Sequence, residues 1–341
     1  MPEALGSDAN NLSEALSDEA STPPKSLSDM PVDVVGLIIR RSDYKEQLIL
    51  RKVSKSLRAL VDIQKPSLTR FHIYGGKDHI QCCYNGRLAI YVSPDCKDLK
   101  ILLNGRKERV IVRDDYEKIA LDDIAFTLKN PNLQLDAFSA DFNSQYANWS
   151  QHARFREMLE SIGHQVSTRS CKIEVLQPSI YFSILPYLKP GVLEKIAVSY
   201  YNYADNGETV WDTFYQISLL DQWKQAKELN SMFLYDTFPL EYATHFKRFH
   251  FYTMGIDSRL LIRLRNNLAT SNNFEYCRIL TFFSFDAQYL CDLLGEPAAP
   301  NKRTEYVSHY QIPNSDDYLE FMFVIKDQHI HIEKKKKQQP S

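Results

Sequence analysis

Between residues 28 and 62 the apolar positions recur at the spacing of an α-helix. The first stripe follows an i, i+3, i+4 pattern and consists of Pro31, Val34, Val35, Ile38 and Ile39. The second stripe, which has basic residues on its opposite face, consists of Leu50, Val53, Leu57, Leu60 and Val61. Because two short helices cannot bury both stripes against each other, the pattern predicts an apolar surface for a partner protein. Packing of both helices on the rest of the chain is the alternative.

From residue 68 to residue 92 the pattern changes to alternation of apolar and polar residues, which is typical of β-strands. Asn85-Gly86 separates two of these runs. Both residue types tolerate the positive φ angles of a two-residue turn, so the sequence predicts a β-hairpin here.

Short apolar strands and helical stretches alternate through the rest of the chain. The strands are predicted around residues Leu135, Glu174, Ala197, Phe233, His250 and Leu280. Helices are predicted over residues 114–128, 155–162, 180–188 and 257–268. Such a series implies parallel strands covered by helices, and apolar alternation over 319–332 predicts a closing antiparallel pair. Because the strand intervals are irregular but in the solenoid range, we expect an α+β or α/β fold. The chain would begin with a helical domain. For the part that follows, we expect a leucine-rich-repeat-like β-α array rather than a doubly wound sheet.

Composition and charge are those of an ordinary globular protein. The net charge is −2, and 44% of residues are hydrophobic. The six cysteines have no pair at the spacing of a zinc or redox motif, which favours free thiols. The N-terminal residues are acidic and lack the apolar region of a secretory signal, and no apolar run is long enough to span a membrane. These features predict a cytoplasmic or nuclear protein.

Motifs for catalysis, cofactors and metals are missing from the sequence. There is no phosphate loop, dinucleotide fingerprint, zinc-protease motif or nucleophile elbow, so we expect neither an enzyme nor a cofactor. His329 and His331 share one face of a predicted strand, but a third metal ligand is not evident, and we predict no metal site. Residues 40–58 are basic without a nucleic-acid motif, which favours a solvated helix face over nucleic-acid binding.

The N-terminal helical segment resembles an F-box. The resemblance rests on Met30-Pro31-Val32-Asp33-Val34-Val35 and on residues 50–58, which read LRKVSKSLR. Met30 stands where most F-boxes have leucine, and Leu57 stands where many have tryptophan. The resemblance implies binding to a Skp-type adaptor and, through it, to a cullin. The residues expected to bind the adaptor are Met30, Pro31, Val34, Val35, Ile38, Leu50, Val53 and Leu57.

The remainder is similar to the FTH domain that accompanies F-boxes in a large nematode family. The segments that carry this resemblance are residues 128–133, 185–196, 222–227 and 312–321. Together the two resemblances predict a disordered tail (1–25), an F-box (26–66), hairpins and first β-α units (67–149), an FTH domain (150–295), closing strands (296–333) and a basic tail (334–341).

The resemblance implies a substrate adaptor of a ubiquitin ligase, with a protein target bound by the FTH region. Aromatic residues near a glycine-containing loop are candidates for the target site, because tyrosine and tryptophan are enriched in binding hot spots. They are Tyr200, Tyr201, Tyr203 and Trp211. Two alternatives stay open. The aromatic residues would instead pad the core, and the F-box would serve only as an interaction or packing surface without ligase coupling. The sequence does not identify the target or the oligomeric state.

Overall fold

The computed structural model of the chain divides into two compact units. They comprise residues 1–64 and residues 65–341. The structure describes residues 27–64, 66–96, 109–142, 149–175, 178–200, 208–233, 240–298 and 305–336. The predicted N-terminal disordered tail lies outside these residues.

The N-terminal unit is formed by short helices. They are η1 (Leu27–Asp29), α1 (Val32–Arg41), α2 (Tyr44–Val53) and α3 (Lys55–Ile63). Asp43 and Glu46 form a reciprocal capping box at the start of α2, with both bonds at 2.9 Å. Ser54 is extended (φ −152°) and caps α3 by accepting from the Leu57 backbone N–H at 3.1 Å. The prediction of one helix through the second stripe is therefore wrong, because Ser54 breaks it into two.

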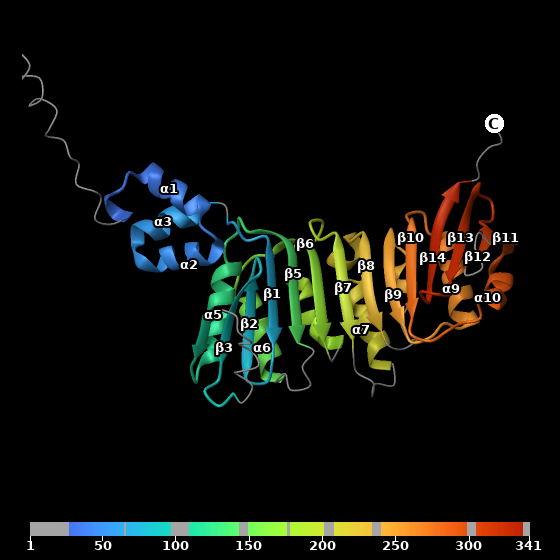
Figure 1. Cartoon of the computed structure of the whole chain (residues 1–341), viewed down its shortest axis with the longest axis horizontal. Coiled ribbons are helices and arrows are strands. Elements are labelled where there is room, and N and C mark those ends of the chain that lie inside the picture. The colour runs from blue at the N-terminus through green and yellow to red at the C-terminus, as the bar shows by residue number, and fades with distance from the viewer. Residues whose placement is uncertain are drawn as a thin grey trace, which may run out of the picture. The chain divides into compact units, whose positions relative to one another are not determined.

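The second unit is built on one mixed 14-stranded sheet (Figure 1). Its first strands are β1 (Arg70–Gly75), β2 (His79–Tyr84), β3 (Arg87–Val92), β4 (Arg109–Val112), β5 (Gln134–Phe142), β6 (Ser167–Val175) and β7 (Lys195–Tyr200). The others are β8 (Glu228–Phe233), β9 (Arg248–Thr253), β10 (Tyr276–Thr281), β11 (Glu296–Ala298), β12 (Glu305–Gln311), β13 (Asp317–Val324) and β14 (His329–Lys336). The strand order is β11-β12-β13-β14-β10-β9-β8-β7-β6-β5-β1-β2-β3-β4.

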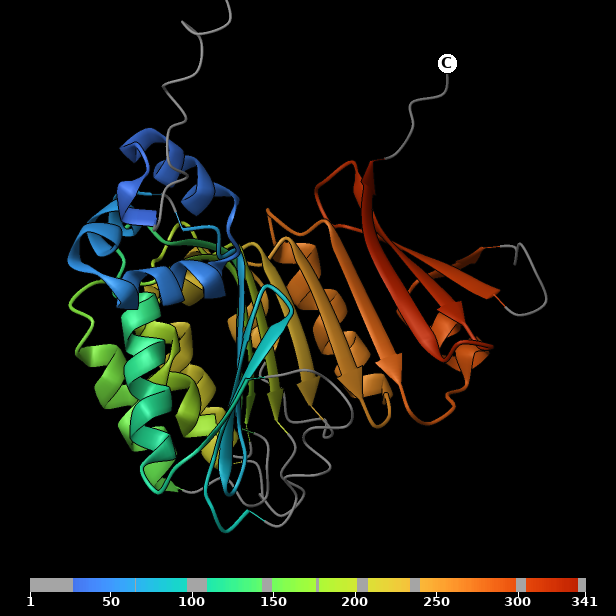
Figure 2. The same ribbon diagram turned by 60° about the vertical axis from the view of Figure 1, so that its left-hand side comes forward.

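The helices of this unit cover one face of the sheet (Figures 1 and 2). They are α5 (Tyr116–Leu128), α6 (Trp149–Glu160), α7 (Glu208–Ser218), α8 (Asp221–Gln225), α9 (Ser258–Thr270) and α10 (Ala287–Leu294), with short 3-10 turns η2 (Pro178–Ser183), η3 (Leu185–Tyr187) and η4 (Leu240–Ala243). Burial alternates along the strands accordingly. In β10, for example, Cys277 and Ile279 are buried, whereas Tyr276, Arg278 and Leu280 are partly exposed on the other face. The core therefore lies between the sheet and the helices.

The predicted β-α series is confirmed as a set of parallel strands. Strands β5, β6, β7, β8, β9 and β10 lie side by side in chain order, and each contains or adjoins a predicted strand centre. The predicted closing strands are β13 and β14, which pair antiparallel. Since the helices of the described residues cover one face, the sheet is not doubly wound, as expected. The leucine-rich-repeat-like detail stays a prediction. The hydrogen-bonded sheet is continuous across the predicted domain boundaries at residues 149 and 295.

The C-terminal lysines depart from the prediction of a basic tail starting at residue 334. Lys334 to Lys336 belong to β14. Lys334 lies 3.6 Å from an Asp317 carboxylate oxygen, and Lys335 is ion-paired with Glu320 and with Glu333. Asp317 and Glu320 on the neighbouring strand β13 thus pair with Lys334 and Lys335, which the run of lysines in the sequence does not reveal.

The predicted hairpin turn between β2 and β3 is confirmed. Asn85 has φ +51° and Gly86 has φ +88°, as a type I′ turn requires. The Asn85 side chain also fixes the preceding segment. Its Oδ1 accepts from the Thr69 and Arg70 backbone N–H groups at 3.0 and 2.9 Å, and its Nδ2 donates to the Ser67 carbonyl at 2.8 Å.

Replacing Asn85 should therefore destabilise the sheet in two separable steps. Asn85→Gly keeps the positive φ and loses the side-chain bonds, which should lower the free energy of unfolding by about 1–2 kcal/mol. Asn85→Ala also forces an alanine into the left-handed region, which costs about 1–2 kcal/mol more. Urea denaturation of both variants measures the difference. Equal stability of the two would contradict the role given to the backbone angle.

Candidate adaptor-docking surface

The N-terminal unit has a core of three buried side chains. Val35 on α1, Ile39 on α1 and Leu57 on α3 are 4%, 0% and 5% exposed. Partly buried apolar residues pack around them, namely Met30, Leu50, Leu60 and Val61. This is a very small core, so each of its members is needed to hold the helices together.

Polar contacts reinforce this helical arrangement. The buried Gln47 side chain donates to the backbone carbonyls of Ile39 and Ser42, at 2.9 and 3.2 Å, and so ties α2 to the end of α1. Arg51 on α2 forms a two-bond ion pair with Asp62 on α3, at 2.5 and 3.1 Å. Arg51 is thus occupied within the unit, which weakens the nucleic-acid interpretation of this basic segment.

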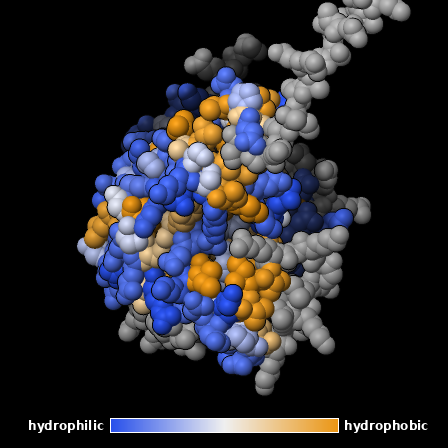
Figure 3. All heavy atoms as spheres, turned by 90° about the vertical axis from the view of Figure 1, so that its left-hand side faces the viewer, coloured by the Kyte–Doolittle hydropathy of each residue, from blue (hydrophilic) through white to orange (hydrophobic). Residues whose placement is uncertain are grey.

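Several large apolar side chains of the same unit stay on its surface. Val34 and Leu37, one turn apart on α1, are 43% and 46% exposed, and Ile49 and Val53, one turn apart on α2, are 49% and 66% exposed. Val32 and Ile63 are exposed as well. In Figure 3, orange apolar surface interrupts the hydrophilic side chains in the upper part of the view, where these helices lie. Exposed apolar surface of this kind is typical of an interface.

The structure divides the predicted adaptor-binding residues between surface and interior. Pro31, Val34 and Val53 are exposed, and Ile38 is half-buried. Met30, Val35, Leu50 and Leu57 form the core or pack against it. The prediction that Val35 and Leu57 lie on the free surface is therefore wrong. The break at Ser54 turns α3 so that Leu57 points inward, where it packs in one cluster with Val35. Leu37 and Ile49 were missed, although their exposure follows once the helix boundaries are known.

The predicted target-binding residues cannot be placed as a surface. Tyr201 and Tyr203 lie outside the described residues, as do the side chains of Tyr200 and Trp211. Their role stays a prediction.

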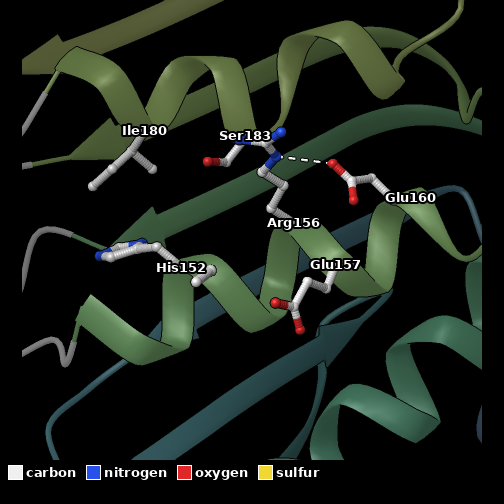
Figure 4. A pocket seen from close by; sticks show the side chains of 7 residues that line it. His152, Arg156, Glu157, Glu160, Ile180 and Ser183 are labelled. Carbon is white, nitrogen blue, oxygen red and sulfur yellow. Dashed lines mark hydrogen bonds and ion pairs between the residues drawn. The ribbon is translucent and has the colours of Figure 1, made fainter.

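A pocket of about 460 Å³ lies between α6 and η2 on the helical side of the sheet (Figure 4). His152, Arg156 and Glu160 line it from α6, and Ser183 lines it from η2. Arg156 Nε donates to Glu160 at 2.9 Å, and the Tyr187 hydroxyl donates to the same carboxylate at 2.7 Å. The Tyr187 hydrogen bond and Arg156 lower the pKa of Glu160, which keeps it ionised. Oε1 of Glu160 is thus held by Arg156 and Tyr187 at this pocket.

His152 in this pocket makes the stability of the fold depend on pH. Its ring meets Phe142 edge-on at 4.8 Å, and burial lowers its pKa to about 4. In the unfolded chain the imidazole titrates near 6.5. Unfolding therefore takes up a proton between about pH 4 and 6.5, so the stability that neutral His152 contributes is present above pH 6.5 and is lost as the pH falls towards 4.

We expect His152→Gln to flatten this pH dependence. Between pH 6.5 and 4, the free energy of unfolding should fall by roughly 2–3 kcal/mol more in the wild type than in the variant. Urea denaturation at a series of pH values measures it, with His164→Gln, at a partly exposed histidine, as the control. Parallel profiles for the wild type and His152→Gln would refute the assignment.

Four of the six cysteines are buried, and Cys83 and Cys96 are partly exposed. All six cysteines are free, and burial raises the pKa values of the Cys82, Cys171 and Cys277 thiols. Within the part of the chain that the structure describes, no group of three or more histidine, cysteine, aspartate or glutamate side chains has the geometry of a metal site. No described helix combines the length and the apolarity that a membrane span requires.

Comparison with known proteins bears on both units. The F-box domain model matches residues 27–68, and the FTH domain model matches residues 151–297. The chain thus contains an F-box domain and an FTH domain. The resemblance predicted from the sequence is thereby confirmed.

A relative of the chain agrees with both domain matches. F-box A protein 224 of Caenorhabditis elegans is 26% identical over 268 residues, which cover 75% of the chain and 66% of the relative. The chain thus spans slightly less than two thirds of the length of this curated relative. No solved structure matches the chain.

Proposed function

We propose that this F-box protein is a non-catalytic substrate adaptor of a ubiquitin ligase. Its F-box binds a Skp-type adaptor and, through it, a cullin, and its second unit, which contains the FTH domain, binds the target protein. F-box proteins are generally such adaptors, which supports the proposal. The protein would act in the cytoplasm or the nucleus.

The observation that carries the proposal is the apolar surface of the F-box. Val34 and Leu37 on α1, with Ile49 and Val53 on α2, are exposed although the unit already has a core. A stable protein–protein interface buries about 1,600 Å² in total and places apolar side chains at its centre. Full burial of one such side chain contributes up to about 1.5–3 kcal/mol, so covering these four residues with a partner favours docking.

Tethering explains how an adaptor without catalytic groups promotes ubiquitin transfer. Binding of the target to the second unit converts its encounter with the conjugating enzyme into an intramolecular event. The effective concentration then reaches the millimolar range for short flexible connections. No residue of this chain has to form or break a bond.

The parallel array supports target binding by the second unit. Six parallel strands lie in chain order with helices on one face, an arrangement that we interpret as a degenerate leucine-rich-repeat-like array. Such arrays present the opposite face of the sheet to their partners. In this protein the opposite face carries polar and aromatic side chains, for example Tyr74, Asn230, His250 and Arg278.

Co-purification with a Skp-type adaptor tests the proposal directly. The full chain should retain the adaptor, and a substitution at an exposed F-box valine should abolish retention without unfolding the unit. Absence of any complex with a panel of Skp-type adaptors would contradict the proposal.

The second candidate is a protein-binding module whose F-box no longer couples to a ligase. The replacement of the usual tryptophan by Leu57, which sits in the core of the unit, is the observation that favours it. Accumulation of the bound target after proteasome inhibition would support the ligase adaptor, whereas an unchanged target level would favour the module.

A further inference from the structure

The most exposed residue of the F-box docking surface has basic neighbours. Val53, the last residue of α2, is 66% exposed. Three exposed basic residues flank it in the chain, namely Lys52, Lys55 and Arg58. Arg51 is basic too, but it is paired with Asp62 at 2.5 and 3.1 Å. Since residues 47–64 contain no acidic residue besides Asp62, this segment has an excess of positive charge around Val53.

The helix that follows does not explain its first basic residue. Lys55 is the first residue of α3, which has no acidic residue in its first turn. The first turns of α1 and α2, by contrast, contain Asp33 and Glu46. Because the amino end of a helix carries a partial positive charge, a cation at this position is unfavourable in the free protein. The dipole of α3 therefore opposes Lys55.

Ion pairing within the F-box does not explain the basic residues of α3 either. Neither Lys55 nor Arg58 forms an ion pair among the residues that the structure describes. Arg58 Nε donates to the backbone carbonyl of Arg51, at 3.4 Å. Both side chains are exposed, so a partner that approaches Val53 meets their charge.

An apolar contact with basic neighbours fits an acidic protein surface. Protein interfaces have an apolar centre and a polar rim. Ile49 and Val53, one turn apart on α2, supply apolar side chains, and Lys55 and Arg58 continue this surface onto α3. A nucleic acid would engage the cations through its phosphates, but it would leave the two aliphatic side chains without a matching contact. Carboxylates beside an apolar patch satisfy both features.

We propose that Lys55 and Arg58 pair with carboxylates of the Skp-type adaptor beside the apolar contact made by Val53, and that this attraction steers the adaptor to the F-box. The inference rests on the proposed function and adds the chemistry of the partner, whose surface at this place is acidic. Charge pairs at the rim of an interface raise the association rate more than the lifetime of the complex.

The first test is the salt dependence of adaptor binding by the full chain. Salt screens exposed charges, so the association rate constant should fall about 10-fold between about 0.05 and 0.5 M NaCl. The dissociation rate constant should change less than about 3-fold, because the apolar contact holds the complex together. Stopped-flow or biolayer interferometry measurements with the purified adaptor give both constants.

Charge reversal identifies the residues responsible. Lys55→Glu and Arg58→Glu should each lower the association rate constant about 5-fold to 10-fold at low salt, and the differences should vanish at high salt. The matched control is Lys224→Glu, at an exposed lysine of α8 outside the F-box. It changes the net charge of the chain equally and should alter the rate less than about 2-fold.

The stability of Lys55→Glu separates a docking role from a folding role. A carboxylate at the first residue of α3 suits the helix dipole, and it can pair with Arg58 three residues later. The thermal midpoint of the free full chain should therefore stay equal or rise while adaptor association slows. A lower midpoint with proportionally weaker binding would assign Lys55 to folding and overturn the inference.

Substitutions in the adaptor locate the paired carboxylates. Its exposed aspartates and glutamates are changed to lysine one at a time. At one or more of these positions, the changed adaptor should associate faster with Lys55→Glu than with the wild-type chain, because the charges of the pair have been exchanged. A complete scan without such a position would refute the pairing.

The remaining outcomes distinguish this inference from the proposed function. Salt-independent association, or equal slowing by Lys55→Glu and Lys224→Glu, would refute the inference and leave the adaptor function standing. No binding of the wild type to any Skp-type adaptor would refute both. If Lys55→Glu abolished binding to a duplex oligonucleotide but left adaptor association unchanged, the basic residues would belong to a nucleic-acid site instead.

Discussion

Val34→Asp and Val53→Asp should each weaken binding of the Skp-type adaptor about 10-fold or more while leaving the F-box folded. Both side chains are exposed, at 43% and 66%, so a carboxylate at either position stays in water in the free protein. In the complex the charge would be buried without a partner, which costs at least about 2 kcal/mol at an interface centre. Biolayer interferometry against the purified adaptor measures the loss.

Matched variants distinguish docking from folding. Val112→Asp changes a valine of similar exposure (45%) on β4, outside the F-box, and should not affect adaptor binding. Val35→Asp and Leu57→Asp should abolish binding by a different route, because they bury a charge in a core of three residues and unfold the unit. Far-UV circular dichroism and protease resistance of residues 27–64 separate the two routes. Full adaptor binding by Val34→Asp and Val53→Asp would refute the docking surface.

Trp223→Ala, in the FTH domain, should strongly destabilise the second unit of the chain. Trp223 on α8 is 0% exposed, and its ring packs edge-on against Phe246 at 5.0 Å and Phe214 at 6.0 Å. Its Nε1 donates to the Tyr242 carbonyl at 2.7 Å. Removal of a buried aromatic side chain costs about 3–5 kcal/mol, and the carbonyl left unpaired adds about 1–3 kcal/mol.

A loss of that size approaches the total stability of an ordinary domain, which is about 5–15 kcal/mol. Trp223→Phe keeps most of the ring packing and loses the hydrogen bond, so it should cost distinctly less. Equilibrium unfolding in urea, followed by circular dichroism, measures both variants. A Trp223→Ala protein within about 1 kcal/mol of the wild type would contradict the packing described here.

The structure explains why one segment of the FTH resemblance contains both Gln222 and Trp223. The buried Gln222 side chain donates to the carbonyls of Pro186 and Leu188, at 3.1 and 2.7 Å, and so ties α8 to η3. Trp223 ties the same helix to η4 through Tyr242. Sequence reasoning could find the motif by resemblance, but its structural role depends on contacts 19 to 36 residues apart in the chain.

Most strands followed from the sequence, because their alternation is a local pattern, whereas the helix predicted over residues 180–188 is in fact the 3-10 turns η2 and η3. The strands near Leu135, Glu174 and His250 and the turn at Asn85-Gly86 needed no tertiary information. The F-box was recognisable for the same reason, since its pattern lies within about 40 neighbouring residues.

Only the tertiary structure decided which side chains of those elements are free. Leu57 and Val53 share one helical stripe in the sequence, yet the extended backbone at Ser54 sends one into the core and leaves the other in solvent. Arg278 is one of many basic residues in the sequence, and only the sheet register places it between His250, which precedes it by 28 residues, and His331, which follows it by 53 residues. Burial and charge pairing depend on neighbours that are distant in the chain, so no local pattern contains them.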